Sequence, residues 1–411
     1  MDLIRRYYLA VGGDRSLPVQ HEGFGTLNFI VIALIQVLLL QPDAAGIVVL
    51  IEEPEIGLHP QAQRLLFRKL AEVYKHTGNQ LIISTHSPNV ALMWHQSDFR
   101  HKITRLVKRS IQEGTQVIPT PNIETSGGEA TAPNTLKKIV RQHMMTLGGD
   151  VFFADKVVIV EGATELGALP LLAQRLDYDF EANNISVVMA GGANSMPTLA
   201  SMCRDLNIPC LVLYDLDIFV RDGSLARKLN TKSDEYMKLK AALAKLGSPK
   251  EKASEDEIDK ATTALTNLGW NPTKDDVSDF LSKFKTRDKL SGLVPTAEEM
   301  TAINDILFTA NAWALPMDFE EAFLEHYPPS DYDDIRTLIK NIYDKTDCEQ
   351  YRDQLNSDES NKKYKKCMAE LLKRTCKNEY FWRIFLSGTL PNGSGWIHPE
   401  LVRFIKKLKE L

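Results

Sequence analysis

The sequence predicts an α/β protein made of two successive units, with a helical insertion in the second unit and a helical C-terminal region. Short runs of branched apolar residues alternate with amphipathic stretches of helical length in residues 1–115, and again in 151–330. Strands and helices that alternate in this way form parallel sheets through right-handed crossovers. Residues 116–150, which begin with a stretch rich in Pro, Thr, Gly and Ser, are expected to form a linker.

The composition bounds the class of protein. The 411 residues are 44% hydrophobic and 25% charged, with a net charge of -5, enough for two to three ordinary domains. The most apolar stretch, 29–40, is too short to cross a bilayer, and no signal-peptide pattern is seen, so a cytoplasmic protein without membrane contact is expected. Five cysteines without a C-x-x-C pair indicate reduced thiols rather than a zinc site or a disulfide framework. The mildly acidic charge leaves nucleic-acid binding open, because local basic patches set that affinity.

In the first unit, helices and strands alternate. Helices are expected at 26–40 and 60–76, and buried strands at 47–51 and 81–84. The first strand runs directly into Glu52 and Glu53, at the end where ligands bind in open α/β sheets.

Two other features accompany these acids. His86 closes the second strand and can hydrogen-bond a γ-phosphate, and Gly23 and Gly25 lie in a turn that can present backbone N–H groups to phosphate at a helix N-terminus. Taken singly, the two glutamates can be a solvated strand end, and His86 can be a capping or core residue.

In this order, the glycine turn, the acidic strand end, the Glu-Ile-Gly-Leu-His-Pro segment and the histidine resemble the ATP-binding-cassette class of ATPase heads. That resemblance implies that Glu52 holds Mg²⁺ through water and that Glu53 polarises the attacking water. No G-x-x-x-x-G-K-[ST] phosphate loop occurs in the chain. ATP is therefore expected to bind only when a partner chain or a missing N-terminal segment supplies that loop, and no ATPase activity is expected from this chain alone.

The second unit shows the same alternation. Strands are expected at 157–160, 185–190, 210–214 and 311–317, with helices at 164–176 and 196–206. A helical insertion covers about 221–305, and residues 331–411 are expected to be mainly helical.

Carboxylates follow two of these strands. Glu161 and Glu165 are spaced i, i+4 across a turn, and Asp215 and Asp217 are two residues apart along a strand end, so each pair can face one way. Hard oxygen ligands at this density suit Mg²⁺ or Mn²⁺. Alternatively, these acids cap helices or end strands in water.

The arrangement resembles a Toprim domain, and a cassette-type ATPase followed by Toprim is the order found in OLD-family (overcoming lysogenization defect) nucleases. The resemblance covers roughly 23–324. It implies that Glu161, Asp215 and Asp217 are metal ligands or acid/base groups and that Glu165 serves a second metal ion.

The sequence assigns roles to four further positions less specifically. Glu320 lies in a segment similar to the family's later acidic element, in a register left open by the long insertion. Ser195 can contact a phosphate or cap the next helix. Lys373 and Lys377 are the candidates for a lysine that the family uses near the end of its Toprim domain, and either can be a solvated surface residue.

Together these features predict a Mg²⁺- or Mn²⁺-dependent DNA endonuclease, with one ion activating water and a second stabilising the leaving oxygen. The incomplete ATPase unit would regulate this activity through dimerisation around nucleotide. The alternative is a non-catalytic ATP-sensing or DNA-binding assembly subunit in which the Toprim acids are structural.

Overall fold

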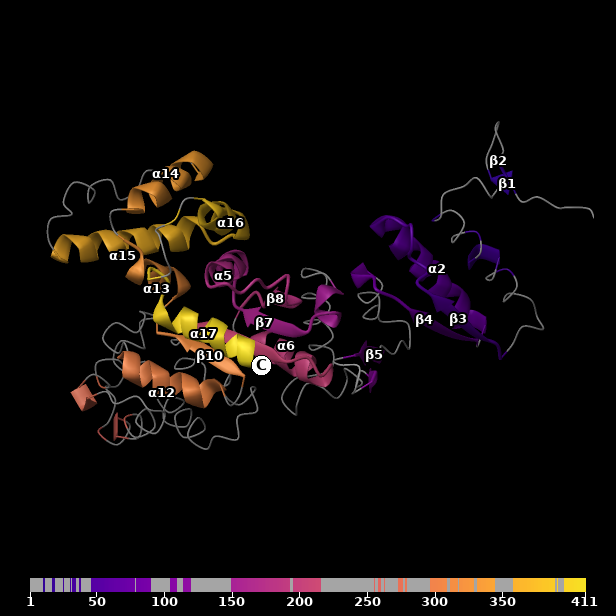
Figure 1. Cartoon of the computed structure of the whole chain (residues 1–411), viewed down its shortest axis with the longest axis horizontal. Helices are drawn as coiled ribbons and strands as arrows, with labels where there is room; N and C mark the ends of the chain where they lie inside the picture. Colours follow the sequence, from indigo (N-terminus) through magenta and orange to yellow (C-terminus); the bar gives the residue numbers. More distant parts are fainter. Residues whose placement is uncertain are drawn as a thin grey trace, which may run out of the picture. The chain divides into compact units, whose positions relative to one another are not determined.

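The computed structural model describes residues 10–11, 17–18, 46–77, 79–89, 104–108, 114–119, 149–192, 195–215, 296–308, 311–316, 318–328, 331–343, 358–388, 390 and 395–411, with single positions between 25 and 37 and between 255 and 278. These residues divide into two compact units, and the chain passes from one to the other between Phe153 and Ala154 (Figure 1). Across the described residues, no helix is long and apolar enough to cross a membrane.

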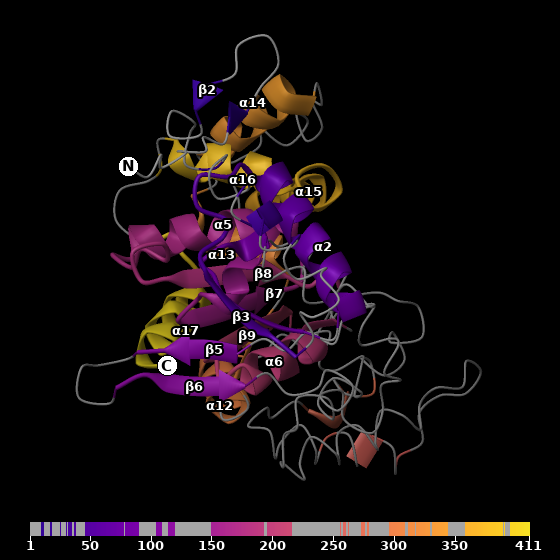
Figure 2. The same ribbon diagram turned by 90° about the vertical axis from the view of Figure 1, so that its right-hand side faces the viewer.

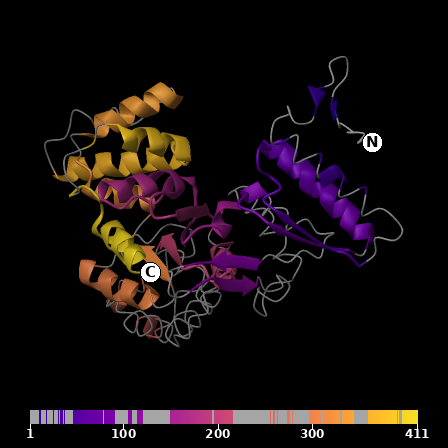
Figure 3. The same cartoon turned by 45° about the vertical axis from the view of Figure 1, so that its right-hand side comes forward.

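The N-terminal unit is built around a parallel pair of strands. β3 (Val48–Glu52) and β4 (Gln80–Ser84) pair in register from Val48 with Gln80 to Glu52 with Ser84, as the sequence predicts. The amphipathic helix α2 (Pro60–Thr77) connects them, and its apolar side packs on one face of the pair (Figure 3). A second, antiparallel pair is formed by β1 (Ala10–Val11) and β2 (Leu17–Pro18).

The opposite face of β3 and β4 is apolar and exposed. Val48 is 52% exposed, Leu50 73% and Ile82 57%. Apolar side chains that alternate with buried ones along a strand normally face a second layer. Among the described residues of this unit, a second layer covers only the face of β3 and β4 on which α2 packs.

An antiparallel pair of strands was not predicted. β5 (Thr104–Val107) pairs with β6 (Gln116–Pro119), seen at the lower left of Figure 2. Residues 116–119, expected as the beginning of a linker, are therefore a strand, because backbone pairing with β5 outweighs their turn-like context. Strand pairing of this kind depends on a partner that lies elsewhere in the sequence.

The C-terminal unit contains a four-stranded parallel sheet. Its strands are β7 (Lys156–Val160), β8 (Ile185–Met189), β9 (Cys210–Asp215) and β10 (Ala312–Leu315), in the order β10-β9-β7-β8. All neighbours are parallel, which confirms the predicted α/β sheet. Four residues of β7 and all of β10 are buried, as is usual for strands covered on both faces.

Eight helices of the described residues accompany this sheet. They are α5 (Ala163–Arg175), α6 (Met196–Asp205), α12 (Ala297–Phe308), α13 (Phe319–His326), α14 (Tyr332–Tyr343), α15 (Asp358–Thr375), α16 (Glu379–Ser387) and α17 (Pro399–Glu410). α5 packs closely on α16: a Cβ atom added to Gly167 would lie 2.6 Å from the carbonyl oxygen of Glu379. α12 and α17 both contact β10.

Both ends of α17 are held by side chains of this unit. His398 stands at its N-cap, where Nδ1 accepts a hydrogen bond of 3.1 Å from the backbone N–H of Glu400. Lys156 donates to the carbonyl oxygens of Leu408 and Lys409 at the other end. The predicted helical C-terminal region is thus tied back onto the first strand of the sheet.

Some expectations concern residues outside this description. The helix expected at 26–40 and the insertion at about 221–305 are described only at single positions and at the start of α12. Among the described cysteines, Cys203, Cys210 and Cys376 are free and buried, but Cys367 is disulfide-bonded. The expectation of reduced thiols is wrong at Cys367, because a disulfide needs proximity in space rather than a C-x-x-C spacing.

Candidate functional site

The acidic strand ends of the C-terminal unit lie at one edge of the sheet. β7 and β9 are direct neighbours, paired from Val157 with Cys210 to Ile159 with Val212. Glu161 follows the last residue of β7, and Asp215 is the last residue of β9, opposite Leu315 of β10. Parallel strands end at a common edge, so these two acids lie at the same edge. Asp217 lies outside the described residues.

A short turn carries the chain from this edge into α5. Gly162 is the N-cap residue of α5 and has extended backbone angles. Glu165, in the first turn, is 9% exposed, and its Oε2 would lie 3.3 Å from a Cβ atom added to Gly162. A residue with a side chain at position 162 would therefore crowd this carboxylate. The turn brings Glu165 back toward the strand end that carries Glu161.

α13 brings a third acid to the same place. Glu320, in its first turn, is 4% exposed, and its Oε1 accepts a hydrogen bond of 3.0 Å from the hydroxyl of Thr164. Thr164 was not identified from the sequence. The sequence position of Thr164 could have indicated this role. It stands between a strand-end acid and a helix-start acid, where a hydroxyl donor can orient a carboxylate.

The electrostatics of Glu165 show that these groups form a cluster. Burial is the main reason that its pKa rises, to about 7, and the charges of Glu320 and Glu161 raise it further. The N–H of Glu165 itself and the charge of Lys377 act in the opposite direction. A divalent cation among these carboxylates would favour their ionised forms.

The two candidate lysines have different surroundings. Lys373, whose side chain is 9% exposed, pairs with Asp318 at 2.7 Å and with Glu321. Lys377 is exposed and is the lysine whose charge acts on Glu165. Of the two, Lys373 is held in ion pairs, and Lys377 is the one whose charge acts on Glu165.

Ser195 occupies the N-cap position of α6, as one of its two predicted roles requires. Its side chain makes no capping hydrogen bond there. The capping role is therefore not fulfilled by the hydroxyl group, although the position was predicted.

The acidic strand end of the N-terminal unit forms a separate group. Glu53 has φ of 42° and donates its backbone N–H to the carbonyl oxygen of Ser84 over 3.0 Å. Its Oε1 lies 3.4 Å from Nε2 of His86. The structure thus brings together the second acid and the histidine predicted from the sequence, at the carboxyl ends of β3 and β4. Glu52, the last residue of β3, is exposed.

Glu55 has a role that was not predicted. It is 7% exposed, and its Oε1 accepts hydrogen bonds from the Thr85 hydroxyl and from the backbone N–H of His86. Its other oxygen, Oε2, is buried and has no hydrogen-bond partner among the described residues. The position of this acid, immediately after Glu-Pro, could have indicated its role from the sequence. Glu55 fixes the segment that carries His86.

The glycine turn is described at one of its two predicted positions. Gly25 is buried against the chain after β3: a Cβ atom added there would collide with the carbonyl oxygen of Gly57. Gly23 lies outside the described residues. Only a glycine at position 25 allows this approach of the two backbones.

Two family models match the chain. Residues 152–217 match "Overcoming lysogenization defect protein-like, TOPRIM domain", and residues 3–91 match "AAA ATPase domain". The first contains the β7 and β9 strand ends and the second contains the β3 and β4 pair. The resemblance inferred from the motifs and the predicted fold class are confirmed.

Relatives with curated names match over part of their length. The chain is 30% identical to the OLD nuclease of Thermus scotoductus (strain ATCC 700910 / SA-01) over 225 residues, which are 55% of this chain and 41% of that protein. It is 27% identical to Endonuclease GajA of Bacillus cereus (strain HuB5-5) over 231 residues, 51% of this chain and 33% of that protein. The chain therefore spans less than half the length of these relatives.

Solved structures of C-terminal regions of OLD proteins also align with the chain. The region from Xanthomonas campestris pv. campestris aligns over 63% of this chain and 96% of its own length, at 17% identity and a TM-score of 0.34. The region from Burkholderia pseudomallei aligns over 63% and 98%, at 15% identity and a TM-score of 0.35.

Proposed function

We propose that this chain, which its Toprim match and its curated relatives connect to the OLD-family nucleases, cuts or nicks DNA by metal-assisted hydrolysis at the acidic edge of its four-stranded sheet. The observation that carries the proposal is the burial of Glu165 beside Glu161 and Glu320, which raises its pKa to about 7. Acids gathered in this way are costly to the fold unless a cation or a proton compensates their charge, and groups with such shifted pKa values concentrate at functional sites.

Each side chain has a proposed role. Glu161, Glu165, Asp215 and Asp217 would hold Mg²⁺ or Mn²⁺, two ions in all, which when bound supply an activated water and neutralise developing charge on the phosphate. Glu320 would complete this set, in the orientation fixed by Thr164. Lys377 would contribute positive charge next to the reacting phosphate. DNA is the proposed substrate because the relatives are named as nucleases.

A plasmid assay tests the proposal directly. Purified chain is incubated with supercoiled plasmid and Mg²⁺ or Mn²⁺, and nicked and linear forms are separated by electrophoresis. Nicking by the wild type that is lost in Asp215→Asn and with chelator supports the nuclease. Equal behaviour of the two proteins, with no nicking from either, favours the non-catalytic assembly subunit instead.

The nucleotide-binding role of the N-terminal unit requires a further lobe. Glu52, Glu53 and His86 would bind Mg-ATP only together with a phosphate loop, which this sequence lacks. The exposed apolar face of Val48, Leu50 and Ile82 supports this proposal, because a phosphate-loop lobe that packs on this face as a further layer would cover it. Such a lobe, from another segment or chain, and a homodimer around nucleotide are the proposed partners, and the cytoplasm is the proposed location.

A further inference from the structure

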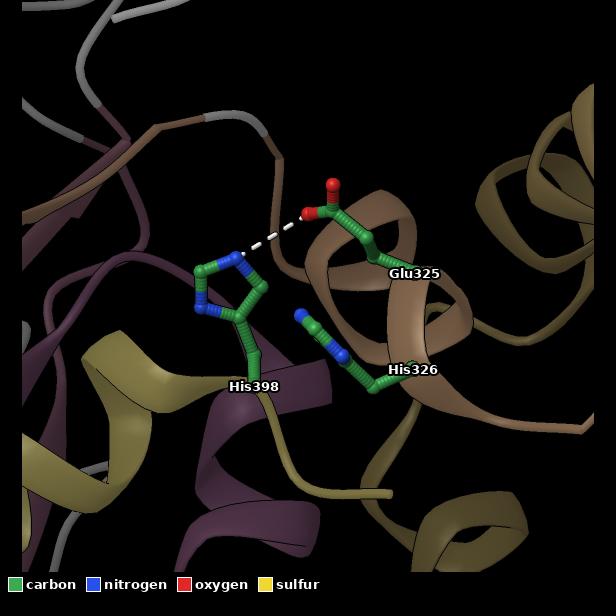
Figure 4. Close-up of side chains that lie close together, drawn as sticks. All are labelled: Glu325, His326 and His398. Carbon is green, nitrogen blue, oxygen red and sulfur yellow. Dashed lines mark hydrogen bonds and ion pairs between the residues drawn. The ribbon is translucent and has the colours of Figure 1, made fainter. Parts of the chain in front are cut away.

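A second group of metal-ligating side chains lies at the far end of α13. Glu325 and His326 are in the last turn of this helix, and His398 precedes α17 (Figure 4). One ligand atom from each residue lies within 4.8 Å of the other two. Glu320 and Glu325 are five residues apart, about 7.5 Å along the helix and on sides that differ by about 140°. The group is therefore distinct from the acidic edge of the sheet.

The spacing of these atoms is close to that of a metal site. Nε2 of His398 and Oε2 of Glu325 are 3.0 Å apart. Zinc bonds of about 2.0–2.1 Å in a tetrahedral arrangement separate neighbouring ligand atoms by about 3.3–3.4 Å. The longest separation in the group, within 4.8 Å, needs to shorten by about 1.5 Å at most. His326 is exposed and can make this adjustment by rotation of its side chain.

The ring of His398 already directs its Nε2 atom toward Glu325. Its Nδ1 accepts the backbone N–H of Glu400, so the remaining ring proton is on Nε2, which donates to Glu325. A metal-binding histidine usually donates its other ring N–H, so the proton of His398 has to move to Nδ1 before Nε2 can bind an ion. The His326 ring lies 5.2 Å away, between centroids, at an angle of 76°.

We propose that Glu325, His326 and His398 bind a Zn²⁺ ion, with water at the fourth position. Two imidazoles and one carboxylate suit zinc far better than Mg²⁺, which prefers oxygen ligands. Zinc binds through the lone pair of Nε2, so the ring proton of His398 moves to Nδ1, which then gives up the hydrogen bond from the backbone N–H of Glu400.

Lys365 is the charge that opposes the ion. This half-buried lysine interacts electrostatically with Glu325, His326 and Glu321, and burial lowers its own pKa. Its ammonium group competes with a cation for the Glu325 carboxylate. Removing it is therefore expected to strengthen the site.

The ion would join two parts of the C-terminal unit. α13 begins with the acid proposed for the nuclease site, and α17 packs on β10. The three side chains now connect the segments through the hydrogen bond between His398 and Glu325 and the ring contact between His398 and His326. Zinc would bind all three side chains and hold the C-terminal end of α13 in place.

Zinc titration of the full chain tests the site. Metal-free protein in excess Mg²⁺, which occupies all-oxygen sites, is titrated with Zn²⁺ against a coloured chelator, and with Co²⁺ while its visible absorption is recorded. We expect one ion per chain, with the absorption of tetrahedral Co²⁺. Glu325→Gln, His326→Asn and His398→Asn should each weaken binding at least about tenfold. The asparagine at 398 keeps an N-cap acceptor.

Two further variants make the result specific. Lys365→Met should strengthen binding. His86→Asn removes the other described histidine that lies beside a glutamate, at 3.4 Å from Glu53, and should leave binding unchanged. Zinc binding that survives in both Glu325→Gln and His326→Asn, or that is lost in His86→Asn, overturns the proposal, as does a wild type that binds no zinc. The outcome is independent of nicking activity, which the plasmid assay measures.

Discussion

The hydroxyl group of Thr164 donates a hydrogen bond of 3.0 Å to Oε1 of Glu320, although 156 residues separate the two in the sequence. Thr164 and Glu320 are both buried. The bond joins the first turn of α5 to the first turn of α13 and fixes the direction of the Glu320 carboxylate. The position of this acid relative to the sheet edge is therefore set by a side chain and not by the backbone alone.

Thr164→Val should weaken metal binding at the acidic edge. Valine keeps the shape of threonine but removes the donor to Glu320, and the loss of a buried hydrogen bond to a charged group costs about 1.5–3 kcal/mol. The Mg²⁺ concentration for half-maximal nicking should rise by about tenfold or more. Thr164→Ser keeps the hydroxyl and serves as the control. Equal Mg²⁺ dependence in wild type and Thr164→Val would show that this bond does not position a ligand.

Glu165→Gln should stabilise the metal-free protein at alkaline pH. The pKa of Glu165 is about 7 in the folded chain and 4.5 in its reference state. Stability from its protonated form is complete below about pH 4.5 and is lost as pH rises through about 7. The amide of glutamine does not ionise, so we expect the variant to be more stable by about 2–3 kcal/mol at pH 8 and equal near pH 4.

Thermal unfolding at the two pH values, with and without Mg²⁺, measures this effect. Mg²⁺ should stabilise the wild type at pH 8 and have little effect on Glu165→Gln, because the ion binds the ionised carboxylate. A variant that is equally or less stable than the wild type at pH 8 would contradict the assignment of Glu165 as a buried, ionisable ligand.

Local patterns were sufficient to predict most of the sheet. β7 and β9 are runs of branched apolar residues followed by acids, and period and composition identify such strands from a few neighbouring residues. β6 was read as a linker, because its pairing with β5 is not encoded in its own composition. Thr164 and Glu55 stand at positions that local patterns could have indicated, but the residues that they bond could not be predicted, for the same reason as the partner of β6. Each is defined by a residue at least 30 positions away.

Substitution of Lys373 should mainly lower stability, and substitution of Lys377 should mainly lower the nicking rate. Lys373 is almost buried between Asp318 and Glu321, so Lys373→Met leaves two acids without this cation and should lower the free energy of unfolding by about 1–3 kcal/mol. Lys377 is exposed, so Lys377→Met should change stability by less than about 0.5 kcal/mol.

The nicking rate should fall more in Lys377→Met than in Lys373→Met. Lys377→Met removes the positive charge that acts on Glu165 and should reduce the nicking rate by about 100-fold. Lys373→Met should retain most of its rate at a temperature where it is folded. Unfolding curves and plasmid nicking, measured on both proteins, give the comparison. A large loss of rate in Lys373→Met alone would move the proposed role to that lysine.

Leu50→Asp tests whether the exposed face of β3 and β4 binds a phosphate-loop lobe. Leu50 is 73% exposed, so the charge should leave the unfolding temperature of this chain nearly unchanged.

The chain alone should release no phosphate from ATP above background. When a polypeptide that carries the phosphate loop is added, hydrolysis should appear and should be abolished by Glu53→Gln, which removes the proposed water-polarising carboxylate. Leu50→Asp should prevent it as well, because a carboxylate buried in an apolar interface costs several kcal/mol. Robust hydrolysis by the chain alone that disappears in Glu53→Gln would instead mean that the phosphates are held by residues of this sequence.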